Sequence, residues 1–472
     1  MNIAIVGGGT SGLLSGLALE KEGHKVMIFE KNIIGGLCRS EKINGYTMDI
    51  GVHAITMLNN GPLIRLLYKY SNYIPNFKPY GDYYVRDNNI LTPIPVSMQE
   101  ITTTPIIPKK DKVLISSKII DLMTTGFSKD VSAYEIIKNI PISKKSYDFF
   151  NTICYFLSGE DAKYTPLWRL FTGANYIPED DIIPFIYNDL KINPLKMSVF
   201  KKFNKNNMKS LLNDGFVLSI KKGSKKYINK FINRERFHSQ GYPVGGVQSI
   251  LNSILYSLEK KEIYNEEVIK IEEVNEKEGK YCITTKIKNN NLGNNKYYAD
   301  VVVYSAPSKN LPNITNIEEI KKIENNLKNI KHSNSLTVWI GHKDNPLNYI
   351  GSEIWIDHPC WATCTSNYDK NLAPKNKHLL GFSFVNEKKE NALNIIENKL
   401  NLNVDKADFI HYQQYIPEQA SCVVGQFFVY PKIRDDFYIV GTDADPRSMG
   451  ITRAAYSVET MLSEFKNSHI VK

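Results

Sequence analysis

The first thirty or so residues constrain the fold more than any other part of the chain. Residues 2–6, NIAIV, form a short apolar run with branched side chains, which is typical of a buried strand. The glycine-rich stretch GGGTSG at 7–12 follows it and matches G-x-G-x-x-G. Residues 11–23, SGLLSGLALEKEG, have helical apolar spacing and end at a glycine, and residues 24–30, HKVMIFE, predict a second buried strand. The order of strand, tight turn, helix and strand predicts an α/β domain.

The spacing of the glycines indicates what this turn holds. Gly7 permits the turn, Gly9 lets a pyrophosphate approach the backbone, and Gly12 lets the helix pack closely on the strand. The helix N-terminus offers free N–H groups to phosphates, and the carboxylate of Glu30 can accept both hydroxyls of an adenosine ribose. The segment predicts a Rossmann-like dinucleotide site, with FAD and NAD both open at this point. The expected cofactor-binding residues are Gly7, Gly9, Thr10, Ser11, Gly12, Glu30 and Lys31.

A second motif lies in residues 31–56, KNIIGGLCRSEKINGYTMDIGVHAIT. The glycine pair Gly35-Gly36 allows backbone to lie against a ligand, and Arg39 can pair with a second phosphate. Asp49 and Gly51 fit the end of a strand and a turn beside the ligand. The alternative is a plain loop that carries a surface cation. The residues added to the expected cofactor site are Gly36, Leu37 and Arg39.

This second motif resembles the FAD-binding signature of a large flavoprotein superfamily. Its members include flavin amine oxidases, protoporphyrinogen oxidases and phytoene-type desaturases, with UDP-galactopyranose mutase as a more distant relative. They carry an acidic strand end, then GG-x-x-R-[ST], then an Asp-x-Gly step, which here ends at Gly51. The resemblance implies FAD as the cofactor. It also implies that His53 lies beside the flavin, as a candidate catalytic residue or a hydrogen-bonded structural histidine.

The resemblance returns at three later points in the chain. Gly245-Gly246 precede an amphipathic helix and a strand containing Val268, which the resemblance places near the adenine. Residues 299–311 resemble the strand that returns to the nucleotide domain, and residues 435–462 resemble the C-terminal flavin motif. In that motif Thr442 departs from the usual Gly-Asp pair, so Asp443 could be displaced. The residues that this resemblance adds to the cofactor site are Val268, Asp443, Gly450 and Ile451.

The order of these matches implies a discontinuous domain organisation. We expect an FAD-binding domain built from residues 1–70, 236–307 and 425–472, with an inserted α+β substrate domain from residues 71–235 and 308–424. Within the inserted parts, 133–140 and 146–173 are helical in pattern, whereas 335–343 and 378–385 are strand-like.

Composition adds few constraints on partners. The net charge of +10 suits an anionic ligand, nucleic acid or lipid, but a Lys/Ile/Asn-rich composition bias explains it as well, and no nucleic-acid partner is expected. Cys360 and Cys364 have the spacing of two ligands on a helix, but buried thiols are favoured and no metal site is expected. No apolar run reaches transmembrane length and no signal peptide is recognisable, which predicts a cytoplasmic protein.

Three enzymatic functions follow from the resemblance. The first is an FAD-dependent oxidoreductase that takes hydride from a C–N or C–C bond of a small organic molecule. The alternatives are a flavin-dependent isomerase similar to UDP-galactopyranose mutase and a polyisoprenoid desaturase in peripheral contact with a membrane. A flavoprotein scaffold without catalysis is the non-enzymatic alternative, and the oligomeric state stays open.

Overall fold

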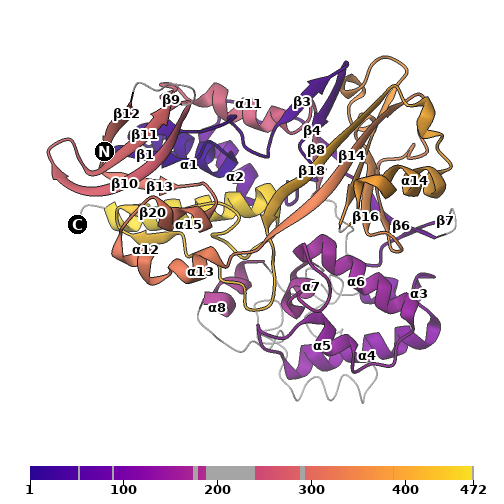
Figure 1. The fold of residues 1–472 in the computed structure, drawn as a ribbon. Helices are drawn as coiled ribbons and strands as arrows, with labels where there is room; N and C mark the ends of the chain where they lie inside the picture. Colours follow the sequence, from indigo (N-terminus) through magenta and orange to yellow (C-terminus); the bar gives the residue numbers. More distant parts are fainter. Residues whose placement is uncertain are drawn as a thin grey trace.

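The structure is a computed structural model that describes residues 1–51, 54–87, 90–173, 179–187, 240–287, 293–385 and 387–469 (Figure 1). Two sheets, each with its own helices, make up most of the molecule, and a separate group of helices lies beside the second sheet.

A six-stranded sheet forms the centre of the first layer. Its order is β19-β20-β13-β1-β2-β9, and all neighbouring strands are parallel except β19 and β20. Ile5, Ile28 and Val303 are buried in it, because a parallel sheet is covered on both faces. The strands are β1 (Asn2–Val6), β2 (Lys25–Phe29), β9 (Ile263–Tyr264), β13 (Val301–Tyr304), β19 (Lys432–Arg434) and β20 (Phe437–Ile439).

The two faces of this sheet are covered differently. Side chains of Ile3 and Ile5 pack with four helices on one face, whereas Ala4 and Val6 pack with a small antiparallel sheet and two short helices on the other. This alternation follows from the two-residue period of a strand. The helices of the first face are α1 (Thr10–Lys21), α2 (Pro62–Tyr70), α11 (Gln248–Ser257) and α15 (Gly450–His469). The elements of the second are β10 (Glu266–Glu276), β11 (Gly279–Ile287), β12 (Asn294–Ala299), α12 (Glu318–Lys322) and α13 (Glu324–Lys328).

A seven-stranded mixed sheet forms the second part, in the order β18-β14-β17-β16-β15-β6-β7. Helix α14 (Lys389–Leu400) packs on it through Ala392 and Ile396. The strands are β6 (Asp82–Asp87), β7 (Ile90–Pro93), β14 (His332–His342), β15 (Gly351–Trp355), β16 (Cys360–Cys364), β17 (His378–Phe384) and β18 (Phe409–Ala420).

Further helices lie beside this sheet, except for α8, which lies near α13 of the first part (Figure 1). Ser97 and Ser143 cap two of them by accepting hydrogen bonds from backbone N–H groups. They are α3 (Met98–Thr103), α4 (Lys109–Thr125), α5 (Ala133–Ile137), α6 (Lys144–Ser158), α7 (Leu167–Gly173) and α8 (Ile182–Tyr187). Two-stranded pairs are β3 (Ser40–Ile43) with β4 (Tyr46–Asp49) and β5 (Phe77–Pro79) with β8 (Gly241–Pro243). Short 3₁₀ helices span Glu179–Asp181, Ser308–Asn313, Thr365–Asn367, Lys370–Leu372 and Val404–Lys406.

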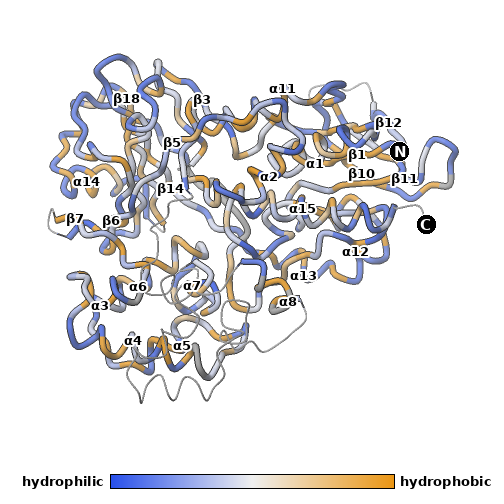
Figure 2. Tube along the Cα trace, turned by 180° about the vertical axis from the view of Figure 1, so that it is seen from behind, coloured by the Kyte–Doolittle hydropathy of each residue, from blue (hydrophilic) through white to orange (hydrophobic). Residues whose placement is uncertain are grey.

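The predicted α/β fold class is confirmed, as are the strands at 335–343 and 378–385 and the helices within 133–140 and 146–173. The favoured interpretation of Cys360 and Cys364 as buried thiols is confirmed, and the two residues do not lie on a helix. These residues form β16, which pairs on both sides with β15 and β17, and both thiols are buried and free. In Figure 2 hydrophobic residues concentrate along the central strands and hydrophilic residues along the outer loops.

The segments 1–70, 236–307 and 425–472 supply every strand of the six-stranded sheet, and the intervening segments supply every strand of the seven-stranded sheet. The domain boundaries themselves stay a prediction.

Candidate cofactor site

The glycine turn after β1 has the geometry that its sequence predicts. Gly7 has a φ of +108°, in the range that favours glycine, and its N–H donates to the carbonyl of Phe29 at 2.8 Å. A Cβ on Gly12 would lie 2.0 Å from the carbonyl oxygen of Gly7, so only glycine fits there. By contrast, a Cβ on Gly9 would meet no atom within 4 Å. The backbone at Gly9 is therefore open to a ligand at the N-terminus of α1.

The second glycine pair packs directly on this turn. The Gly35 N–H donates to the Gly8 carbonyl at 2.8 Å, and Gly9 and Gly35 form a parallel bridge. A Cβ on Gly36 would lie 3.4 Å from the Cα of Gly9. The two motifs, predicted separately from the sequence, thus form one continuous backbone surface.

Glu30 reaches this surface from the end of β2. Its Oε2 accepts the Gly8 N–H at 2.8 Å, and its Oε1 accepts the Asn32 N–H at 2.8 Å. Each oxygen keeps further acceptor capacity, as a ribose diol requires. Lys31 is exposed and pairs with Glu267 at 3.6 Å.

Arg39 and Asp49 bond mainly to protein groups. The Arg39 guanidinium donates to the Gly36 carbonyl and pairs with Glu41 at 3.0 Å. The buried Asp49 carboxylate accepts the hydroxyls of Ser40 and Tyr242 at 2.6 Å each. It also accepts the Val247 N–H, just before α11, at 3.1 Å. Asp49 therefore ties the second motif to the start of α11. Leu37, from the same motif, is 36% exposed.

The C-terminal motif meets the same edge of the sheet. Gly441 has a φ of +129°, and a Cβ there would lie 3.7 Å from the Ser11 hydroxyl. The Ser11 and Ser305 hydroxyls lie 2.7 Å apart, at the ends of α1 and β13 respectively. The carboxyl ends of β1, β2, β13 and β20 thus converge, which is where open parallel sheets bind their ligands.

Asp443 turns to partners that the sequence did not suggest. Its Oδ2 accepts the Ser308 N–H at 2.8 Å, and its Oδ1 lies 3.1 Å from Nε2 of His332, the first residue of β14. Burial alone raises the pKa of the Asp443 carboxyl, but the bonds from His332 and Ser308 outweigh it and leave that pKa below its ordinary value. No local pattern could have indicated His332, because it lies 111 residues from Asp443.

Gly450 opens α15 with a φ of +50°, and a Cβ there would meet no atom of the described residues within 4 Å. The next residue, Ile451, packs against the helical face of the six-stranded sheet. The Thr452 hydroxyl lies 2.8 Å from that of Thr56, which follows the second motif. The partial positive charge of a helix N-terminus at this place favours negative charge nearby.

The cofactor contacts of two further residues stay predictions. His53 lies outside the described residues. Val268 is half-buried on β10, pairs with Thr285 of β11, and packs against the second face of the six-stranded sheet. In the described part of the chain no three His, Cys, Asp or Glu residues gather in a group that could hold a metal ion. No helix in the same residues is long and apolar enough to cross a membrane.

Comparisons with known proteins agree with this geometry. Residues 5–71 match the family described as an NAD(P)-binding Rossmann-like domain. An uncharacterized protein from the nifH2 3′ region of Methanothermococcus thermolithotrophicus is 70% identical over 103 residues, which are 22% of this chain and all of that protein. A 4,4′-diapophytoene desaturase of Staphylococcus aureus is 40% identical over 58 residues, 12% of each chain.

Solved structures share the fold over nearly the whole length. An oxidoreductase from Methanosarcina mazei has a TM-score of 0.67 at 16% identity and covers 98% of this chain and 100% of its own. Reduced UDP-galactopyranose mutase has a TM-score of 0.63 at 16% identity, with 98% and 94% covered. Cyclohexylamine oxidase from Brevibacterium oxydans has a TM-score of 0.60 at 14% identity, with 99% of both chains covered. The chain belongs to the same family as the Methanothermococcus protein, and it shares its fold with flavin amine oxidases, a protoporphyrinogen oxidase and UDP-galactopyranose mutase.

Proposed function

We propose that the protein is an FAD-dependent oxidoreductase that takes hydride from a C–N or C–C bond of a small organic substrate. The observation that carries this proposal is the convergence of three glycine motifs on one edge of the sheet. Among the described residues, a Cβ on Gly9 at the start of α1 or on Gly450 at the start of α15 would meet no atom within 4 Å, and Gly36 lies beside Gly9. An NAD site needs the first of these motifs but has no use for the third.

The residues fit FAD in the following way. The α1 N-terminus would hold the pyrophosphate, and Glu30 would accept the ribose hydroxyls. The α15 N-terminus would face the ring, where its dipole favours negative charge. FAD supplies the hydride acceptor when it is bound. The chain's own contribution is then to orient the substrate and to exclude water, which needs no conserved base.

Anaerobic reduction of the flavin tests the reaction. Purified protein is mixed with amines, amino acids and unsaturated isoprenoids in turn, and bleaching of the flavin absorbance is recorded. A substrate that bleaches the flavin, followed by reoxidation with oxygen or a quinone, supports the oxidoreductase. An isomerase would instead need prior reduction and would consume no oxidant. Turnover of a substrate without net oxidation would contradict this proposal.

A second candidate function is desaturation of a polyisoprenoid at a membrane surface, and the staphylococcal relative is named a 4,4′-diapophytoene desaturase. The distribution of charge in the sequence favours it. Residues 188–239 contain 13 Lys and Arg and 3 Asp and Glu, which leaves 46 of each sign in the rest of the chain. This one segment therefore carries the whole net charge of +10. Clustered lysines attract anionic lipid surfaces.

Sedimentation with vesicles tests the membrane contact. We expect binding to vesicles that contain phosphatidylserine or phosphatidylglycerol, weak binding to pure phosphatidylcholine, and release as salt is raised, because screening weakens the attraction. Equal recovery in the supernatant with all vesicles would remove this candidate and leave the first proposal untouched.

A further inference from the structure

A network of buried charges holds the loop that leads into α15. This loop, residues 445–450, joins the C-terminal strand motif to the helix terminus that would face the flavin. The Arg447 guanidinium binds the buried Asp445 carboxylate in a bidentate pair at 3.0 and 2.8 Å. It also donates to Thr460 at 3.0 Å and lies 4.0 Å from the centre of the Tyr456 ring. These contacts fix the loop against α15 itself.

The second half of the loop is held by its backbone. Ser448 has a φ of +51°, a left-handed conformation that costs energy for any residue with a Cβ. The buried Arg453 side chain donates to the Ser448 carbonyl at 2.8 Å. The Ser448 N–H donates to Oε2 of Glu179 at 2.9 Å. The N–H and the carbonyl of Ser448, two positions before Gly450, are therefore both hydrogen-bonded to charged side chains.

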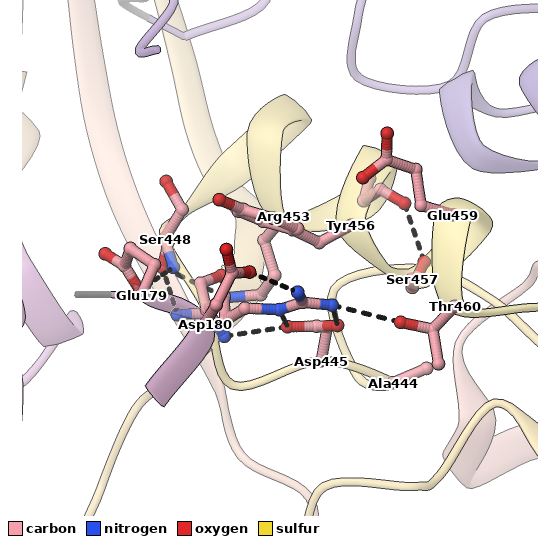
Figure 3. Close-up of polar contacts among 12 residues, drawn as sticks. Glu179, Asp180, Ala444, Asp445, Ser448, Arg453, Tyr456, Ser457, Glu459 and Thr460 are labelled. Atoms are coloured by element: carbon pink, nitrogen blue, oxygen red, sulfur yellow. Dashed lines mark hydrogen bonds and ion pairs between the residues drawn. The ribbon is translucent and has the colours of Figure 1, made fainter. Parts of the chain in front are cut away.

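Glu179 comes from a distant part of the chain. It begins the short segment 179–187, which lies outside the predicted FAD-binding segments and docks through Ile182 between Trp168 and Phe428. Its neighbour Asp180 pairs with Arg447 at 2.9 Å. Figure 3 shows Glu179 next to Ser448, whose N–H it accepts. The Glu179 side chain is 11% exposed and lies 3.5 Å from Arg169.

We propose that Glu179, assisted by Asp180, is a positioning residue for the flavin site. It accepts the Ser448 N–H and so holds the loop in the conformation that presents Gly450 and the α15 terminus. Release of FAD then depends on the hydrogen bond between Ser448 and Glu179, which couples the predicted substrate part of the chain to the cofactor. This inference rests on the proposed FAD function.

Glu179→Ala, Glu179→Gln and a control, Glu135→Ala, test it. Alanine removes the acceptor, whereas the glutamine amide oxygen can still accept the Ser448 N–H. Glu135 is exposed on α5 and pairs only with Lys138 in the described ion pairs, so its loss changes the charge equally without touching the loop. The readouts are hydrogen exchange of residues 445–453 in protein stripped of cofactor, and the rate of FAD release from loaded protein.

In Glu179→Ala we expect hydrogen exchange of residues 445–453 and release of FAD to be about tenfold faster than in wild type. The loss of one hydrogen bond to a charged group predicts a change of this size. Both rates in Glu179→Gln should stay near those of wild type, and both rates in Glu135→Ala should equal those of wild type. Wild-type rates in Glu179→Ala overturn the proposal. Equal acceleration in the alanine and glutamine variants overturns it too, because that result assigns Glu179 to charge pairing with Arg169.

A second variant covers the case in which Glu179→Ala does not fold. The Asp180 side chain is 79% exposed, so Asp180→Ala keeps the fold while removing one partner of Arg447. It should accelerate exchange in residues 445–453 and leave exchange in α5 unchanged. No change in that loop would overturn the proposal. A wild-type protein that binds no FAD would instead refute the function on which the inference rests, and the exchange data would still report on the loop.

Discussion

Glu30 combines two interactions in one side chain. Its carboxylate holds the glycine turn through the Gly8 N–H and has capacity left for a ribose hydroxyl. Glu30→Ala should therefore raise the dissociation constant of FAD at least tenfold, since each charge-assisted hydrogen bond contributes about 1.5–3 kcal/mol. Titration of cofactor-free protein with FAD, monitored by flavin fluorescence, measures this dissociation constant. Glu390→Ala removes an exposed carboxylate on α14, away from this site, and is the control. Equal affinities in both variants would count against the ribose contact.

Gly450 has a matched control in Gly425. Both have positive φ, +50° and +73°, and a Cβ at either would meet no atom within 4 Å. Alanine at either position should cost a similar free energy of unfolding, about 1–2 kcal/mol, from backbone strain alone. Only Gly450→Ala should also shift the flavin absorbance and reduction potential, because its methyl group would lie where the ring is expected. A flavin spectrum unchanged in both variants would show that Gly450 is only the start of a surface helix.

At the scale of elements, the Asp443–His332 pair joins the C-terminal motif to β14. The folded-state pKa of Asp443 is lowered, so the pair contributes stability above the ordinary carboxyl value of 3.8 and loses it as pH falls through the folded pKa. Urea unfolding between pH 3 and 7 should show that Asp443→Asn is less stable than wild type at pH 6, and that the gap closes below about pH 4. Asp130 is exposed, so the control Asp130→Asn should have the same free energy of unfolding as wild type at each pH. A gap independent of pH would contradict the assignment.

The elements that sequence predicts well are those with a local signal. Gly7 and Gly12 mark a turn and a close contact within a few residues, and alternating apolar residues mark β14. Contacts between distant segments leave no such signal. Glu179 and Ser448 are 269 residues apart, and Glu179 stands outside every motif that the sequence shows. Asp49 shows a different limit, because its motif indicated a place near the ligand but not that Ser40, Tyr242 and Val247 would fill its hydrogen bonds.

At the scale of the whole molecule, the six-stranded sheet is assembled from three separate parts of the chain. The C-terminal strand β20 lies beside β13 and brings α15 to the same edge as the N-terminal glycine turn. A ligand that spans both ends of this edge would join segments more than 400 residues apart in sequence. Binding should then stabilise the entire fold, and FAD in excess should raise the melting temperature, since a ligand that binds only the folded state stabilises it by mass action.

The cofactor content of the purified protein tests the central claim most directly. The protein is denatured, and the released nucleotide is identified by chromatography and counted against the chain. We predict a yellow protein with one FAD per chain, because the turn at Gly9, Glu30 and the open terminus at Gly450 together fit the two ends of that molecule. A colourless protein that takes up no FAD and binds NADH instead would contradict the account.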